Sequence, residues 1–192
     1  MDQGKLPTVS PKKLGYYADP VAQNLISSFR QYLSLHYGIW SLPDLVKARA
    51  LKKLFNLKQG LELMAGNAYW SKALSEVGVK MIATDNLRWS ISSKTGSQPI
   101  FPVESLNALE ALEKYQDVDF ILVSWSPNFG KSDLELVNAW RKLANRPKLF
   151  FIGEKEGATN SPEFWQEVKL ERVPIDFPSF DFIDEEIFQV IC

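Results

Sequence analysis

From about residue 58 onward, hydrophobic residues gather in short runs, and amphipathic stretches separate these runs. Five runs predict strands, at residues 61–64, 79–84, 99–103, 118–124 and 147–152. Helices are expected between them, at residues 69–77, 104–115 and 131–144. The run VDFILVS is apolar almost throughout, which is typical of a parallel strand buried on both faces. Alternation of strand and helix predicts right-handed crossovers and a doubly wound parallel sheet.

The tail and the N-terminal part follow other patterns. After the fifth strand, Ser161 and a following proline begin a short helix, and strand-like runs follow at about residues 169–175 and 186–191. Two helices are expected before the sheet, one from Asp19 to Gly38 and one from Ser41. We therefore expect a flexible arm at residues 1–18, two N-terminal helices at 19–57 and one α/β domain at 58–192.

The stretch from Gln59 to Asp85 is the organising unit of the α/β domain. It contains the first strand, a glycine turn, a helix and the second strand, which is about the size of one βαβ module. Glu62 lies inside the first strand, where a carboxylate is costly unless it has a partner. Asp85 closes the second strand, the place where a doubly wound sheet holds the hydroxyls of a ribose.

This stretch resembles motif I and the following strand of class I S-adenosylmethionine-dependent methyltransferases. The family pattern is hydrophobic, acidic, hydrophobic, Gly-x-Gly-x-Gly, and it stands here as LELMAGNA at residues 61–68. Gly66 keeps the central glycine, whereas Met64 and Ala68 replace the outer two. The resemblance implies a seven-stranded, mostly parallel sheet in a three-layer α/β/α arrangement. It also implies that an antiparallel last strand enters between the fifth and sixth strands, and that the cofactor is S-adenosylmethionine.

The resemblance places cofactor-binding residues at the carboxyl ends of the strands: Glu62, Gly66, Asn67, Asp85, Asn86, Asn107, Ala108 and Ser124. Asp85 is expected to accept both ribose hydroxyls, and Glu62 to bond the turn amides or the methionine ammonium. Asn107 and Ala108 fall where the family usually has Asp-Ala, so the Asn107 carbonyl is expected to accept from the adenine amine. Structural alternatives remain open: Asp85 as a helix N-cap, Glu62 as a tie to the loop or to the N-terminal helices, and Asn107 as an ordinary helix residue.

The segment SWSPNF at residues 124–129 closes the fourth strand and supplies the catalytic candidates Ser124 and Trp125. It weakly resembles the Asn/Asp-Pro-Pro-Tyr/Phe motif of methyltransferases that act on amino nitrogens. Its first residue and second proline differ, so nitrogen is not inferred as the methyl acceptor. Trp125, Trp70 and Tyr69 are read either as an aromatic rim of the site or as core residues. Glu154, in an expected charged loop at residues 153–157, is a third catalytic candidate.

Composition narrows the possible functions. The 22 Lys and Arg residues nearly balance 23 Asp and Glu residues, so no basic nucleic-acid face is expected. No apolar run is long enough to span a membrane, and the N-terminus lacks the apolar region of a secretory signal. With one histidine, His36, and one cysteine, Cys192, neither a disulfide nor a His/Cys metal site is expected. A cytoplasmic location fits this composition.

The function expected from these features is methyl transfer to a small-molecule acceptor. One alternative is a catalytically inactive, methyltransferase-like binding module, which the lost glycines favour. A second is an NAD-dependent oxidoreductase, whose fingerprint is Gly-x-Gly-x-x-Gly after the first strand. Met64, Gly66 and Tyr69 occupy those three places, so two of the three glycines are absent. The oligomeric state is left open.

Overall fold

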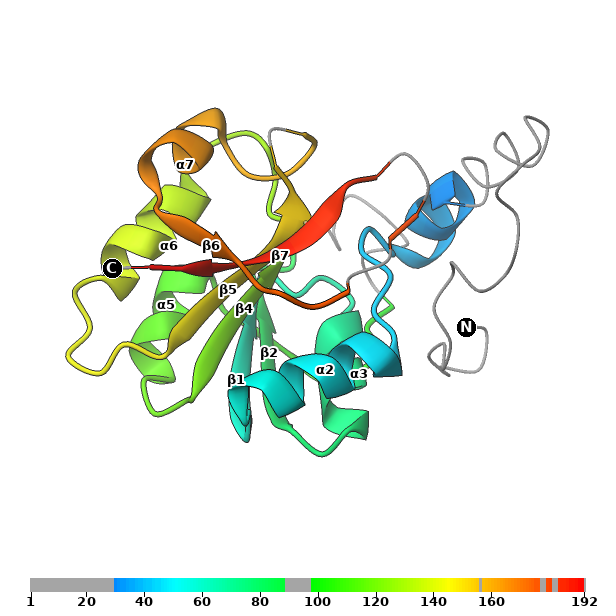
Figure 1. Ribbon diagram of the computed structural model, residues 1–192, viewed down its shortest axis with the longest axis horizontal. Coiled ribbons are helices and arrows are strands. Elements are labelled where there is room, and N and C mark those ends of the chain that lie inside the picture. Colours follow the sequence, from blue (N-terminus) through cyan, green and yellow to red (C-terminus); the bar gives the residue numbers. More distant parts are fainter. Residues whose placement is uncertain (1–29, 89–97, 156, 177–178, 181–182, 192) are drawn as a thin grey trace.

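A seven-stranded sheet in the order β3-β2-β1-β4-β5-β7-β6 forms the centre of this computed structural model (Figure 1). The structure describes residues 30–88, 98–155, 157–176, 179–180 and 183–191. Strands β1 to β5 pair in parallel, and β7 is antiparallel to both β5 and β6. The predicted doubly wound sheet, with the seventh strand between the fifth and the sixth, is therefore confirmed.

The strands are β1 (Gln59–Leu63), β2 (Lys80–Asp85), β3 (Val103–Ser105), β4 (Phe120–Ser124), β5 (Lys148–Glu154), β6 (Leu170–Arg172) and β7 (Glu185–Val190). The helices are α2 (Leu45–Phe55), α3 (Tyr69–Glu76), α5 (Ala108–Lys114), α6 (Ser132–Trp140) and α7 (Pro162–Glu167). Residues 30–37 are also helical and end at Gly38, which has a positive φ of 66°. The predicted arm at residues 1–18, the predicted helix start at Asp19, and Cys192 lie outside the described residues.

Helices cover both faces of the sheet. Successive residues of a strand point to opposite faces, so the apolar residues of one strand contribute to the core on each side. On β4, Phe120 and Leu122 pack in one core cluster with residues of α2 and α3. Ile121 and Val123 pack in a second cluster with residues of α5, α6 and α7. The predicted three-layer α/β/α arrangement is therefore confirmed (Figure 1). None of the helices in the described part of the chain has the length and hydrophobicity needed to cross a membrane.

The third strand differs from the prediction at residues 99–103, because β3 covers only Val103–Ser105. Pro102 has no N–H to donate to the ladder, so the strand begins after it. Ile100 and Phe101 instead pack against the core between the sheet and α2 and α3. The Ile100 N–H donates to the Asn67 carbonyl at 3.0 Å, which holds this segment beside the turn after β1.

Polar caps move the starts of two helices. The α2 helix begins at Leu45 rather than near Ser41, because Asp44 Oδ1 accepts the Lys47 N–H at 2.7 Å. The α5 helix begins four residues later than predicted, because Asn107 caps it. At the end of β5 the prediction was also wrong: the strand continues through Glu154, so the expected loop at residues 153–157 begins in the sheet.

Gly60 is a close-approach position in β1, paired in register with Phe120 of β4. A Cβ at residue 60 would lie 2.2 Å from Phe120 Cζ, so Gly60→Ala has to displace a buried ring. We expect this variant to lose about 1–3 kcal/mol of unfolding free energy in urea denaturation. The double variant Gly60→Ala/Phe120→Leu is expected to lose less than the sum of the two single changes. Simple additivity would contradict the contact.

Candidate functional site

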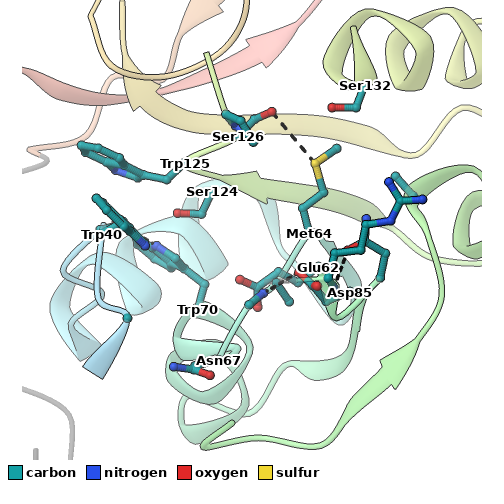
Figure 2. A pocket seen from close by; sticks show the side chains of 18 of the residues that line it. Trp40, Glu62, Met64, Asn67, Trp70, Asp85, Ser124, Trp125, Ser126 and Ser132 are labelled. Carbon is teal, nitrogen blue, oxygen red and sulfur yellow. Dashed lines mark hydrogen bonds between the residues drawn. The ribbon is translucent and has the colours of Figure 1, made fainter. Parts of the chain in front are cut away.

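A cavity of about 940 Å³ lies at the carboxyl edge of the sheet. The segments that follow β1, β2, β3 and β4 line it, together with residues from 38–41. Ligands of open α/β sheets bind outside the carboxyl ends of the strands, and small-molecule pockets typically have volumes of about 300–1,000 Å³. The position and the volume of the cavity are therefore those of a binding site for a small molecule (Figure 2).

All the residues predicted to bind the cofactor line this one cavity: Glu62, Gly66, Asn67, Asp85, Asn86, Asn107, Ala108 and Ser124. The catalytic candidate Trp125 also lines it, as do Trp70 and Tyr69. Glu154 is not among the lining residues. The structure thus gathers residues from four separate strand ends, and it leaves one predicted residue outside the group.

The turn between β1 and α3 has left-handed backbone at each of the three positions where the motif has glycine. The φ angles are 54° at Met64, 52° at Gly66 and 58° at Ala68. A side chain in this conformation costs roughly 1–2 kcal/mol, so Met64 and Ala68 are strained where glycine would not be. The turn therefore has left-handed backbone at two positions where residues with side chains stand in place of the motif's glycines.

Glu62 has the partner that its buried position requires. Its Oε2 accepts the Ser71 N–H at 2.7 Å and the Ser71 Oγ–H at 2.5 Å, which ties β1 to α3. Burial, with a smaller contribution from the nearby Asp85 charge, raises the pKa of the Glu62 carboxyl to about 7, although the Ser71 hydrogen bonds oppose the increase. Glu62 therefore changes charge near neutral pH, at the floor of the cavity.

Asp85 is held by the two turns on either side of it. Its Oδ2 accepts the Gly66 N–H at 2.9 Å, and its Oδ1 accepts the Leu87 N–H at 2.7 Å. An ionised carboxylate has about four acceptor positions, so each oxygen keeps capacity for one more donor. This fixed carboxylate could accept a pair of hydroxyls, as the sequence predicts, without losing its own supports.

Asn107 takes a different role from the predicted one. It is the N-cap of α5, and its Oδ1 accepts the N–H groups of Leu109 and Glu110 at 3.0 Å each. Its own N–H donates to the Glu110 carboxylate, which completes a capping box. The side-chain carbonyl is therefore engaged within the helix cap. The polar groups that remain at this end are donors, namely the side-chain NH₂ of Asn107 and the backbone N–H of Ala108.

Asn67 and Tyr69 are tied to the N-terminal part of the chain. Asn67 Nδ2 and the Tyr69 hydroxyl donate to the same Tyr37 carbonyl, at 2.9 Å and 3.0 Å. These bonds hold Tyr69 against the end of the first helix, where it lines the cavity but does not fill it. Asn86 Oδ1 accepts the Arg88 N–H at 3.0 Å. Asn67 and Asn86 are thus both held by hydrogen bonds where they line the cavity.

The β4 end of the cavity is aromatic. Trp125 has a φ of 54°, and its Nε1 donates to Glu185 at 2.5 Å. The rings of Trp40 and Trp125 stack with centroids 6.2 Å apart, and the Arg30 guanidinium carbon lies 4.9 Å from the Trp125 ring centroid. Burial lowers the pKa of Arg30, and the charges of Glu154 and Glu185 oppose this effect. This end suits a planar ligand, whereas the opposite end is polar.

Glu154 is used to hold a loop. Its carboxylate accepts the N–H groups of Ala158, which lines the cavity, and of Asp184, at 3.3 Å and 3.2 Å, while Glu154 itself is not a lining residue. Hydrogen bonds from Lys114 and Tyr115 lower the pKa of Glu104, the other carboxylate near a strand end, and it does not line the cavity either. Neither of these two carboxylates is among the residues that line the cavity.

The N-terminal segment also contributes to the cavity, which the sequence does not predict. Arg30 and Trp40 line the cavity although they precede the motif region by more than twenty residues, and Glu135 of α6 also lines it. One signal was available, because Trp40 is a large aromatic between Gly38 and Pro43. No periodicity linked that tryptophan to the strand ends.

Comparison with family models finds no match, and no curated protein sequence matches this chain. Among solved structures, a MtNAS mutant is 12% identical, with 88% of this chain and 67% of that chain covered and a TM-score of 0.52. A precorrin-6y C5,15-methyltransferase from Geobacter metallireducens GS-15 is 13% identical. The match covers 75% of this chain and 86% of that chain, with a TM-score of 0.48. A SAM-dependent methyltransferase from Archaeoglobus fulgidus is 15% identical, covering 76% and 92%, also at 0.48.

At such identities the similarity concerns the fold alone. The deciding observation is the strand order, with the antiparallel β7 inserted between β5 and β6. The chain has the class I methyltransferase fold. Within that fold, the left-handed turn from Met64 to Ala68 stands at the motif I position, and Asp85 stands at the end of the second strand.

Glu62 predicts a pH dependence of stability. Because its pKa rises from an ordinary 4.5 to about 7 on folding, the folded state holds a proton that the unfolded state releases between these values. Stability contributed by protonated Glu62 is complete below pH 4.5 and falls as the pH rises to about 7, by about 3 kcal/mol. Urea denaturation should show Glu62→Gln gaining this amount relative to the unsubstituted protein across that window.

Glu135→Gln is the matched control, because Glu135 is exposed on α6. The difference in unfolding free energy from the unsubstituted protein should change more across this pH window for Glu62→Gln than for Glu135→Gln. A constant difference for Glu62→Gln would contradict the raised pKa.

Proposed function

We propose that this chain is an S-adenosylmethionine-dependent methyltransferase that acts on a small-molecule acceptor. The observation that carries the proposal is convergence, because Asp85, Gly66 and Ala108 line the same cavity as Ser124 and Trp125. The first group suits a nucleoside, and the second group lies where an acceptor could meet it. The class I methyltransferase fold supports this assignment without deciding the acceptor.

The polar end of the cavity fits the adenosine part of the cofactor. Asp85 keeps one acceptor position on each oxygen, which matches the two hydroxyl donors of a ribose. The Asn107 amide and the Ala108 N–H are donors, which matches the acceptor nitrogens of an adenine ring. Gly66 and Asn67 would hold the turn beside them, and Asn86 would complete the wall.

Glu62 would hold the ammonium group of the cofactor. A cation beside the carboxyl favours its ionised form, so binding would lower the raised pKa of Glu62 and release a proton near neutral pH. When bound, S-adenosylmethionine supplies a methyl group activated by its sulfonium. The chain's contribution is then to orient an acceptor at the β4 end and to keep water out.

The aromatic end supports a planar acceptor. Trp40 is 41% exposed and Phe129 is 76% exposed, which is high for large apolar side chains. Both line the cavity beside Trp125, and exposed aromatic clusters at a concave site are typical of ligand contacts. Arg30, over the Trp125 ring, adds a cation that would favour an acceptor with an anionic substituent.

Proton removal from the acceptor has one candidate group. Among the described residues that line the cavity, the acidic side chains are Glu62, Asp85 and Glu135. The first two are engaged with Ser71 and with the turns, so Glu135 is the carboxylate left to accept a proton. An acceptor that is nucleophilic without losing a proton needs no base at all.

A second candidate function is a methyltransferase-like binding module without turnover. The observation that favours it is Met64, whose side chain stands inside the cavity at a glycine position of the motif. A side chain there reduces the room for a cofactor, so binding and turnover have to be measured separately.

Asp85→Ala tests the nucleoside site. Removing the carboxylate is expected to weaken S-adenosylhomocysteine binding by about 1–3 kcal/mol in titration calorimetry, or about 5- to 150-fold in Kd. Asp119→Ala is the matched control, because Asp119 also accepts two backbone N–H groups, from Lys58 and Gln59, but at the opposite edge of the sheet. Equal losses of affinity in the two variants, or binding of NAD alone, would contradict the proposal.

Turnover can be tested with S-adenosylmethionine carrying a tritiated methyl group. A panel of planar aromatic alcohols, thiols and amines, with and without a carboxylate, is expected to include at least one labelled product. The control is Asp85→Ala, which should lose the label in proportion to its lost cofactor affinity. Tight cofactor binding with no labelled product across the panel would favour the inactive binding module.

A further inference from the structure

The Met64 side chain lies at the centre of the cavity. Its sulfur accepts a hydrogen bond from Ser126 Oγ at 4.0 Å, so the side chain reaches from the β1 end to the segment after β4. Figure 2 shows it extending between Asp85 and Glu62 on one side and Ser126 on the other. Met64 is only half-buried, whereas Ser126 is fully buried, so the sulfur is anchored while the rest of the side chain faces the cavity.

The sheet order makes this position unavoidable for a long ligand. Strand β1 lies between β2 and β4, so its end separates the Asp85 end of the cavity from the Trp125 end. The proposed ammonium partner, Glu62, lies on β1 two residues before Met64, so an amino-acid arm that extends to Glu62 from a nucleoside at β2 and β3 must pass the residue that follows β1. That residue is Met64, and its side chain already occupies the path.

The backbone of Met64 cannot move aside. The Ala65 N–H donates to the Thr84 carbonyl at 3.0 Å, and the Gly66 N–H donates to the Asp85 carboxylate. The two residues that follow Met64 are therefore both bonded to β2. The side chain itself has three rotatable bonds and one weak hydrogen bond to its sulfur. Only rotation of the side chain can open the path.

We propose that Met64 is a specificity-determining residue, a movable side chain that selects nucleosides by the length of the substituent at the 5′ position. The inference rests on the proposed function, because it places the nucleoside at the Asp85 end. A nucleoside with a short 5′ thioether ends at Met64 and leaves the side chain in place. A nucleoside with a longer amino-acid arm binds only after the side chain rotates away. Its apparent Kd is therefore its intrinsic Kd divided by the fraction of molecules that have the rotated side chain.

Calorimetry with two ligands isolates this effect. 5′-Methylthioadenosine and S-adenosylhomocysteine share the adenosine and the thioether sulfur, and they differ in the amino-acid arm. If the open rotamer is populated about one time in ten, Met64→Gly should tighten S-adenosylhomocysteine binding by about tenfold and change 5′-methylthioadenosine binding by less than about threefold. The glycine also suits the left-handed backbone at residue 64, so this variant should fold.

Two further variants separate volume from chemistry. Met64→Leu keeps the volume without the sulfur and should behave like the unsubstituted protein. Met64→Ala removes the side chain beyond Cβ and should behave like Met64→Gly. A ratio of the two ligand affinities that is unchanged in both truncated variants would overturn the inference and leave the proposed function standing. Failure of both ligands to bind any variant would overturn the proposed function and the inference together.

Rotation can also be observed directly. The chain has three methionines, so a sample with ¹³C-labelled methionine methyl groups gives a simple spectrum. S-adenosylhomocysteine is expected to shift the Met64 methyl resonance, while Met81, which is buried in the core away from the cavity, stays unchanged. A Met64 resonance that does not respond to the bound ligand would overturn the inference.

Discussion

The hydrogen bond from the Gly66 N–H to the Asp85 carboxylate is the interaction on which the site depends. It joins the turn after the first strand to the end of the second, and so it sets the distance between the two main elements of the cavity. Glu62 fastens the other side of the same turn through Ser71 on α3. With both ties in place, the turn holds left-handed backbone at Met64 and Ala68 against its own strain.

Much of this fold could be predicted from the sequence because its signals are strong and local. The buried run at residues 118–124, the capping serine at 161 and the alternation of strand and helix each depend on neighbouring residues alone. The third strand failed because an apolar run is equally compatible with a strand and with core packing. Ile100 and Phe101 pack against the core instead of joining the sheet, because β3 begins only after Pro102.

The position of the cavity could be predicted from the sequence, and the roles of its lining residues less so. Strand ends of a parallel sheet share one edge, so the place of Asp85, Asn107 and Ser124 followed from topology. Whether Asn107 offers an acceptor or a donor to the cavity did not follow from topology, because its side-chain carbonyl accepts two backbone N–H groups of the helix that it caps. The roles of Arg30 and Trp40 depend on how the N-terminal segment packs over the cavity, and no spacing in the sequence encodes that contact.

The antiparallel strand has a consequence for the order in which a ribosome can complete this cavity. Strand β7 is made after β6 but lies between β5 and β6, so β6 emerges before the neighbour that attaches it to the sheet. The first residue of β7, Glu185, also accepts the indole N–H of Trp125. On a nascent chain, the Asp85 end of the cavity can therefore be assembled while Trp125, at the other end, still lacks its anchor.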